Sequence, residues 1–324
     1  MRSDFLFVNL AFVLCNLICH TIGDAPNFIS GCGLTFIKAT QLNTQLYEVV
    51  VSSEQVRGEQ KVRILVPTDY TTSGVSRRYP VLYLLHGAWG SVTDWTVSGA
   101  AQNITSNASL ITVMPNGDLF GFYNNWVIPG EDAPQNWRTY HMEHLVPWID
   151  LNLRTVARKG GRAIAGDSMG GFGAMHYIER YTDNFIYGAS FSGAVDLLDP
   201  LVQAIIIALP GPGHPLVGPF GYPNASTSSN GWIAEDPVTH TSLLHNVSIA
   251  IYIGNVGFLE VALHNSSYHL RDSLISAKIP VYFDDYGDGK SIGYGCDGAH
   301  TWPCWQATLI DVLPRMMAVL EQQH

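Results

Sequence analysis

The sequence predicts an α/β fold in which a mostly parallel central sheet is flanked by helices. Short segments that are apolar throughout recur along the chain, as expected for strands that a sheet buries on both faces. Segments with helical periodicity lie between them, and this alternation is typical of parallel sheets with helical crossovers. The 324 residues are 47% hydrophobic and 14% charged, which fits a dense globular chain rather than a disordered or coiled-coil one.

The predicted elements begin with an antiparallel pair. Residues 24–45 show no clear period, whereas β-branched runs at 46–51 and 61–66 predict two strands at the edge of the sheet, joined by a polar turn. Buried strands are then predicted at 80–85, 110–114, 162–165, 185–190, 248–253 and 280–283, with helices at 140–153, 171–181 and 305–320.

One stretch interrupts this alternation. Residues 200–245 contain Pro-Gly-Pro-Gly and several clusters of Asn, Ser and Thr, so we expect an irregular insertion over one face of the sheet, near the functional site. Neither an internal repeat nor a linker divides the remaining sequence. We therefore expect residues 24–324 to form a single domain.

The start of the chain has the features of a signal peptide. An apolar run at residues 5–19 follows Arg2, but it is short and interrupted by Asn9 and Asn16. We predict a signal peptide at residues 1–23, and an uncleaved anchor is the alternative. Cleavage would leave a protein without an integral membrane span, either secreted or in the lumen of the secretory pathway.

Sequons and cysteines agree with that route. Five Asn-x-Ser/Thr sequons, the acceptors of N-glycosylation, begin at Asn103, Asn107, Asn224, Asn246 and Asn265. Cys15 and Cys19 leave with the signal peptide, and Cys32, Cys296 and Cys304 remain. One disulfide and one spare thiol are expected in an oxidising compartment. Proximity along the chain favours the Cys296–Cys304 pair, and the two pairs with Cys32 are the alternatives.

The charge balance excludes one class of partner. The chain has 17 basic and 27 acidic residues and a net charge of -10, with no local cluster of Lys or Arg. Such a surface repels phosphate backbones, so we expect no nucleic-acid binding.

The strongest chemical signal is the pentapeptide Gly166-Asp167-Ser168-Met169-Gly170. It is a G-x-S-x-G motif placed directly between a predicted strand and a predicted helix. At such a turn the serine hydroxyl is presented at the carboxyl edge of the sheet, beside the amino terminus of the helix. Ser168 is therefore predicted to be a nucleophile.

A serine nucleophile needs a base, and in this architecture the histidine follows the last strand. His300 meets this requirement among the twelve histidines. His141 and His144 flank Glu143 without the spacing of a zinc-binding H-E-x-x-H motif, so no metal site is predicted. The predicted chemistry needs no cofactor.

The histidine in turn needs a carboxylate, expected after the penultimate strand. Glu260 is the first acid after that strand and stands between two apolar residues, which is unusual for a solvated acid. Asp272 is the alternative, although its helical neighbours suit an ordinary surface charge.

The negative oxygen formed during acyl transfer needs two backbone N–H donors. Met169, which follows the nucleophile, supplies the first, and the turn after the strand at 80–85 supplies the second from Ala88 or Gly87. The aromatic residues expected to line the substrate pocket are Trp89, Trp126 and Trp302, with plain packing as the alternative.

These motifs together resemble the putative-esterase family of α/β-hydrolases, which includes S-formylglutathione hydrolase (esterase D), feruloyl-type esterases and mycolyltransferases. The resemblance extends over about residues 46–320 and rests on Leu84-Leu85-His86-Gly87, Asp94-Trp95, Met114-Pro115-Asn116-Gly117, the G-x-S-x-G motif and Gly298-Ala299-His300-Thr301-Trp302. It implies the α/β-hydrolase fold. In the mycolyltransferase-like branch, which is the most similar, the triad acid is a glutamate, which supports Glu260.

The sequence thus predicts a secreted serine esterase that cleaves carboxylic ester or thioester bonds through an acyl-enzyme. The substrate class is a small-molecule or lipid ester. An acyltransferase that passes the same acyl group to an alcohol is the first alternative. A non-catalytic binding module is the second, although such a module would be expected to lack Ser168 or His300. Neither the acyl chain length nor the oligomeric state can be predicted.

Overall fold

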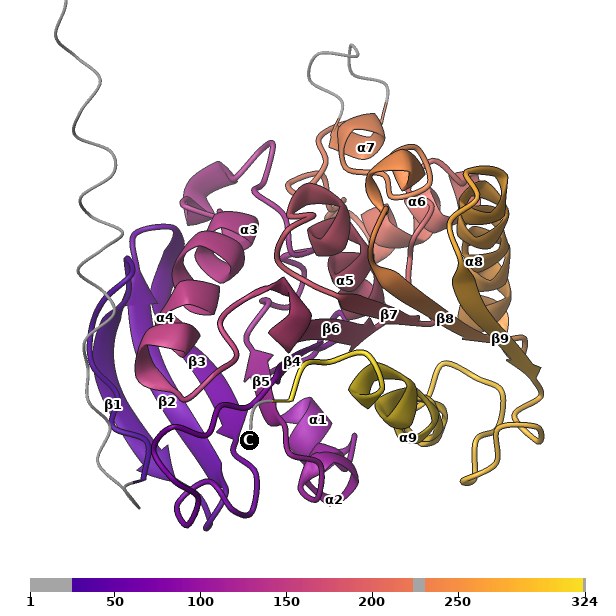
Figure 1. The fold of residues 1–324 in the computed structure, drawn as a ribbon. Coiled ribbons are helices and arrows are strands. Elements are labelled where there is room, and N and C mark those ends of the chain that lie inside the picture. The colour runs from indigo at the N-terminus through magenta and orange to yellow at the C-terminus, as the bar shows by residue number, and fades with distance from the viewer. Residues whose placement is uncertain (1–24, 224–230, 323–324) are drawn as a thin grey trace, which may run out of the picture.

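A computed structural model of the chain describes residues 25–223 and 231–322, which form one nine-stranded sheet with the order β1-β2-β3-β5-β4-β6-β7-β8-β9 (Figure 1). The strands are β1 Thr35–Gln41, β2 Leu46–Ser53, β3 Val56–Leu65, β4 Val81–Leu85, β5 Ile111–Pro115, β6 Arg162–Asp167, β7 Tyr187–Phe191, β8 Ser248–Gly254 and β9 Val281–Gly287. The first three strands pair antiparallel, as do β3 and β5. All pairs from β5 to β9 are parallel. The predicted α/β fold with a mostly parallel sheet is confirmed.

Helices cover both faces of the sheet. They are α1 Asp94–Val97, α2 Ala101–Thr105, α3 Trp137–Thr139, α4 Val146–Asn152, α5 Met169–Arg180, α6 Pro200–Ala208, α7 Gly231–Ala234, α8 Phe258–Ser276 and α9 Trp302–Met317, with a π-helix at Tyr140–Leu145 and 3-10 turns at Gly130–Asp132, Lys159–Gly161 and Thr241–Leu243. Figure 1 shows α1, α2 and α9 together below the sheet and α4, α5 and α6 above it. Each face therefore has its own apolar core.

Strand β8 shows how one apolar segment contributes to both cores. Its alternate residues Ile249, Ile251 and Ile253 pack on the side of α5 and α8, whereas Ala250 and Tyr252 pack on the side of α9. All five are buried. Side chains of a strand point alternately to the two faces, so burial of both faces produces the continuous apolar runs seen in the sequence.

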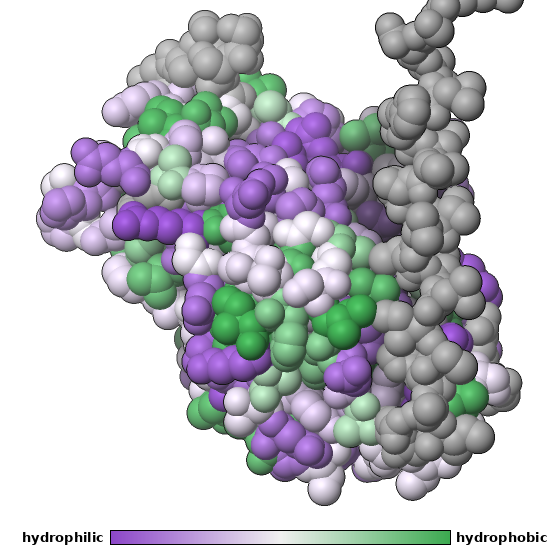
Figure 2. All heavy atoms as spheres, turned by 90° about the vertical axis from the view of Figure 1, so that its left-hand side faces the viewer, coloured by the Kyte–Doolittle hydropathy of each residue, from purple (hydrophilic) through white to green (hydrophobic). Residues whose placement is uncertain are grey.

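The amino-terminal edge differs from the prediction. The two strands predicted at 46–51 and 61–66 are present as β2 and β3, and they pair antiparallel. Their predicted place at the edge was wrong, because β1, within residues 24–45, pairs with β2 and forms the edge of the sheet. Strand β1 is almost fully exposed on both faces, and it therefore lacks the alternation of apolar and polar residues that reveals a strand. Figure 2, which views this side of the molecule, shows hydrophobic side chains in small groups among hydrophilic ones.

Two other elements are longer or less regular than predicted. The helix predicted at 140–153 is the succession α3, π-helix and α4, from residue 137 to 152. The last strand, predicted at 280–283, extends to Gly287 and includes Asp284 and Asp285.

The insertion at 200–245 carries more structure than its composition suggests. It contains α6, α7 and the turn at Thr241–Leu243, and it covers the α5 side of the sheet. The insertion side chains buried in that core are Val202, Ile206, Leu216, Phe220, Trp232 and Leu244. The ring of Phe220 packs edge to face on Phe172 of α5, with centroids 5.6 Å apart. The insertion is therefore part of the hydrophobic packing.

The predicted signal peptide at 1–23 and the sequon at Asn224 lie outside the described residues. Within the ranges 25–223 and 231–322, no helix combines the length and the apolar character needed to cross a membrane.

Candidate functional site

Ser168 stands at a sharp turn between β6 and α5. Its φ is 52°, in the left-handed region that a residue with a side chain rarely adopts. The flanking glycines are required by close packing, because a Cβ at Gly166 would lie 2.5 Å from the backbone of Gly170. A Cβ at Gly170 would lie 2.5 Å from the Leu85 carbonyl oxygen. The strand and the helix can therefore approach closely, and Ser168 is left partly exposed while its neighbours are buried.

The structure brings Glu260 and His300 into contact. The His300 imidazole donates from Nδ1 to Glu260 Oε2 at 2.8 Å. Glu260 lies in the first turn of α8 and is fully buried. Its other oxygen, Oε1, accepts hydrogen bonds from Ser192 Oγ at 2.5 Å, the Gly254 amide at 2.9 Å and the Tyr286 hydroxyl at 3.3 Å. A buried carboxylate with this many donors is well suited to orient a histidine.

These contacts also fix the charge of Glu260. Burial alone would raise the pKa of its carboxyl group. The hydrogen bonds from His300, Ser192 and Gly254 outweigh that effect and hold the pKa of Glu260 below its usual value. Glu260 is therefore a carboxylate at neutral pH, and it favours the His300 tautomer that carries its proton on Nδ1. By contrast, Asp272 is exposed and bonds only to its neighbour Arg271 among the contacts found for its carboxylate.

Ser168 and His300 line the same cavity, whose volume is about 280 Å³. The complete lining is Gly87, Ala88, Trp89, Gly90, Asp94, Asp167, Ser168, Leu209, Leu259, His300, Trp302 and Trp305. Trp89 and Trp302 lie where the sequence predicted them, and Trp305 was missed. The His300 ring also packs edge to face on Trp305, with centroids 4.9 Å apart. Ser168 and His300 thus open onto one small, largely apolar space.

The structure does not bring Trp126 into this lining. Its indole donates to the Gly121 carbonyl at 3.1 Å, and its ring fills the space beside Gly218, where a Cβ would lie 2.1 Å away. The side chain packs against the insertion instead. No local pattern indicates this contact, because the two segments are far apart in the chain.

The loop after β4 is anchored by the fully buried His86. Its Nδ1 donates to the Gly87 carbonyl and its Nε2 accepts from the Gly117 amide, each at 2.8 Å. This pattern requires the neutral ring, in agreement with burial, which lowers the pKa of His86. Gly87 packs against the Asp167 carboxyl group, because a Cβ at Gly87 would lie 2.5 Å from Asp167 Oδ2. Gly87 and Ala88, the two candidate donors to an oxyanion from this loop, both line the cavity that Ser168 lines, and Met169 begins α5.

The loop that carries His300 is closed by a disulfide between Cys296 and Cys304, the pair that proximity favoured. The Val256 amide donates to the Gly298 carbonyl at 2.9 Å and ties the loop to the segment before α8. The predicted sequon asparagines within the described residues, Asn103, Asn107, Asn246 and Asn265, are all exposed.

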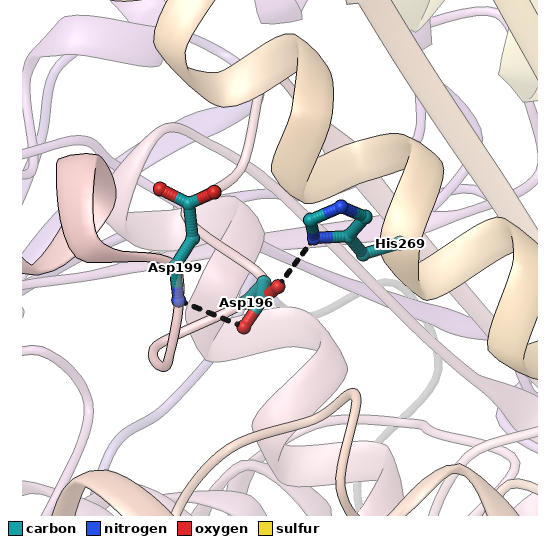
Figure 3. A group of neighbouring side chains, drawn as sticks. All are labelled: Asp196, Asp199 and His269. Atoms are coloured by element: carbon teal, nitrogen blue, oxygen red, sulfur yellow. Dashed lines mark hydrogen bonds and ion pairs between the residues drawn. The ribbon is translucent and has the colours of Figure 1, made fainter.

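One group of side chains in the described residues has the composition of a metal site. The ligand atoms of Asp196, Asp199 and His269 lie within 4.8 Å of one another (Figure 3). Asp199 accepts from the first amides of α6, at 2.8 and 3.1 Å, and Asp196 Oδ1 accepts from the amides of Leu198 and Asp199. Asp196 Oδ2 pairs with His269 Nδ1 at 2.6 Å. The group therefore has a structural role: Asp199 caps the start of α6, and the Asp196–His269 pair joins the segment before α6 to α8.

Comparisons with known proteins identify a family and relatives of this chain. The family described as "Putative esterase" matches residues 53–316. Esterase MT1326 of Mycobacterium tuberculosis (strain CDC 1551 / Oshkosh) is 38% identical over 169 residues, which are 52% of this chain and 36% of that protein. The chain thus covers just over a third of the length of that relative. Diacylglycerol acyltransferase/mycolyltransferase Ag85B of Mycobacterium leprae is 26% identical over 264 residues, covering 74% of this chain and 76% of that protein.

Solved structures share the fold at lower identity. An S-formylglutathione hydrolase from Agrobacterium tumefaciens superposes with a TM-score of 0.68 at 17% identity, covering 88% of this chain and 99% of that one. A ferulic acid esterase gives a TM-score of 0.63 at 20% identity, with coverages of 85% and 99%.

Proposed function

The chain belongs to the putative-esterase family, and on this premise we propose that it is a serine esterase whose triad is Ser168, His300 and Glu260. The observation that carries the proposal is the 2.8 Å contact between His300 Nδ1 and a fully buried Glu260 carboxylate, at the wall of a cavity that also holds Ser168. Three elements distant in the sequence, β6–α5, α8 and the loop before α9, converge there. We include residues 24–324 in one catalytic domain.

The proposed reaction follows from these positions. Ser168 Oγ attacks the ester or thioester carbonyl while His300 Nε2 takes the hydroxyl proton. The amides of Met169 and Ala88 donate to the negative oxygen of the tetrahedral intermediate. His300 then protonates the leaving alcohol or thiol, and water attacks the acyl-enzyme with His300 as base. Glu260 stabilises the imidazolium at each stage, and no cofactor takes part.

The cavity indicates the size of the acyl group. At about 280 Å³ it is slightly smaller than the range of 300–1,000 Å³ typical of sites for drug-sized ligands. Its apolar walls come from Trp89, Trp302 and Trp305, with Leu209 of the insertion and Leu259 at the start of α8. We propose a small-molecule or lipid ester with a compact acyl group at the cleaved bond.

An acyltransferase is the second candidate, and the similarity to mycolyltransferases over three quarters of both chains favours it. Both activities use the same acyl-enzyme and differ in whether water or an alcohol receives the acyl group. We also propose that the protein is secreted and glycosylated. The apolar segment at 5–19, the Cys296–Cys304 disulfide and the exposed sequon asparagines support that compartment.

The test is intact mass spectrometry after incubation with p-nitrophenyl esters of short, medium and long acyl chains. We expect an added acyl group on the wild type and none on Ser168→Ala, whose turnover should fall by about 10⁴-fold or more. Ser276→Ala, a substitution on the exposed end of α8, is the matched control. Product analysis with an added alcohol separates hydrolysis from transfer. Retention of more than a few per cent of turnover by Ser168→Ala would exclude Ser168 as the nucleophile.

A further inference from the structure

Asp167 is a buried acid next to the nucleophile that the triad does not use. It ends β6, it is 1% exposed, and it belongs to the lining of the catalytic cavity. A Cβ placed on Gly87 would lie 2.5 Å from Asp167 Oδ2 and 3.2 Å from Ser168 Cβ. The carboxyl group therefore packs directly against the loop that carries the proposed oxyanion donor Ala88.

The surroundings of Asp167 disfavour a negative charge. No lysine or arginine is among the described residues that line the cavity, whereas Asp94, at the start of α1, is among them. Asp167 Oδ1 is shielded from solvent and has no hydrogen-bond partner in the described structure. A carboxylate in this position would be a buried charge without a compensating cation, which is strongly unfavourable.

The other titratable groups nearby do not change this balance. They are His86 after β4, Tyr123 in the segment after β5, and His300, which faces the same cavity. Burial lowers the pKa of His86 and raises the pKa of Tyr123, so both are neutral at neutral pH. For Asp167 itself, burial is the largest effect and, with the charge of Asp94, raises the pKa well above its usual value, although the backbone amides of Asp167 and Gly87 oppose this rise.

We propose that Asp167 is a positioning residue that acts as a neutral carboxylic acid, holding the oxyanion loop through Gly87, and that its ionisation suppresses the reaction at alkaline pH. The inference rests on the proposed triad. A neutral carboxyl group packs against Gly87 without opposing the charge that develops on the substrate. An ionised Asp167 carboxylate would place a negative charge beside the proposed amide donors of Met169 and Ala88. It would therefore repel the oxyanion that these donors have to stabilise.

The first test compares pH profiles of kcat/KM for ester hydrolysis. The kcat/KM of the wild type should fall by about tenfold or more at alkaline pH. Removal of a whole oxyanion donor, by comparison, costs about 10²–10³-fold in kcat. Asp167→Asn keeps the shape and stays neutral, so this alkaline decline should disappear. Asp167→Ala also removes the group that packs against Gly87, and its kcat/KM should be lower at every pH, with rescue by the Asn variant. Asp272→Asn, on the exposed face of α8, is the control and should keep the wild-type profile.

The second test measures protonation without activity. Infrared spectroscopy uses a Glu179→Gln background, because burial also raises the pKa of Glu179 to about 9 and that acid would add its own band. The Glu179→Gln protein should show a protonated-carboxyl C=O band at neutral pH that disappears as pH rises, in parallel with kcat/KM, and that addition of Asp167→Asn removes. This titration needs only the Glu179→Gln protein if the Asp167 variants do not fold. An alkaline decline in Asp167→Asn that superimposes on the wild type, or the absence of the band at neutral pH, would overturn the inference. A fully active Ser168→Ala would instead refute the triad, while the band in that variant would still report on Asp167.

Discussion

Replacement of Glu260 by Gln tests the proposed triad with the smallest change in shape. The side chain keeps an oxygen that can accept from Ser192 and Gly254, but an amide NH₂ then faces His300 Nδ1, where the carboxylate accepted at 2.8 Å. Two donors cannot share one hydrogen bond. Rotating the amide only moves the conflict to the Gly254 amide. The imidazole is therefore driven to the tautomer with its proton on Nε2, which cannot take a proton from Ser168.

The expected magnitude follows from this loss of the productive tautomer. An Asp→Asn change in the triad of a serine protease lowers kcat by about 10⁴-fold. For Glu260→Gln we expect a decrease of about 10³–10⁴-fold in kcat, equivalent to roughly 4–5.5 kcal/mol of transition-state stabilisation. The decrease should be smaller than that of His300→Ala, which removes the base. Initial rates with p-nitrophenyl acetate give kcat, and circular dichroism checks that the fold is intact.

The matched control lies on the same helix. Asp272 is exposed on α8 and bonds to its neighbour Arg271, so Asp272→Asn should change kcat by less than about twofold. Near-wild-type turnover of Glu260→Gln, together with a large loss in Asp272→Asn, would move the acid along α8. It would show that burial at the carboxyl end of β8 does not identify the triad acid.

Two further predictions concern stability. The double variant Cys296→Ser/Cys304→Ser should lose about 2–3 kcal/mol of unfolding free energy, because the disulfide closes a short loop. Its kcat should also fall, because that loop carries His300. Chemical denaturation measures the stability and ester hydrolysis measures kcat, and an unchanged kcat would refute the second expectation. Burial raises the pKa of Glu179 to about 9, so the folded chain keeps a proton that the unfolded chain releases near the ordinary pKa of 4.5. Unfolding free energy should therefore fall as pH rises between these values, by at most about 1.4 kcal/mol per pH unit, and thermal melts should show a higher Tm for Glu179→Gln than for the wild type at pH 8.

The sequence predicted the parts of the site that depend on order along the chain. Ser168, His300 and Glu260 each follow a strand, and the carboxyl ends of parallel strands meet at one edge of the sheet. Glu260 was recognisable because an acid between two apolar residues requires a buried partner.

The residues that surround the triad could not be predicted in the same way. Ser192 follows β7 and Tyr286 lies within β9, and both reach Glu260 only because these strands flank β8. Nothing in their local sequence indicates a role. Asp167 occupies the variable position of the motif, where spacing carries no information about burial. The exposed strand β1 was missed because an edge strand exposed on both faces has no periodic signal.

Backbone strain at this edge leads to a last prediction. Ser168 and Ser192 have φ values of 52° and 49°, and Trp89 in the loop after β4 has 62°. Three neighbouring strands, β4, β6 and β7, are thus each followed by a residue with left-handed backbone at the carboxyl ends of the sheet. Such residues cost about 1–3 kcal/mol each and persist at sites where the surrounding structure fixes them. Ser192→Ala and Ser192→Gly both remove the hydroxyl that donates to Glu260, but only glycine relieves the strain. Glycine costs about 0.4–1 kcal/mol through its flexibility in the unfolded chain. Ser192→Gly should therefore be the more stable variant by about 0–2.6 kcal/mol, with equal losses in kcat. Urea denaturation of the two variants measures the difference, and a glycine variant less stable than the alanine variant would show that Ser192 is not strained.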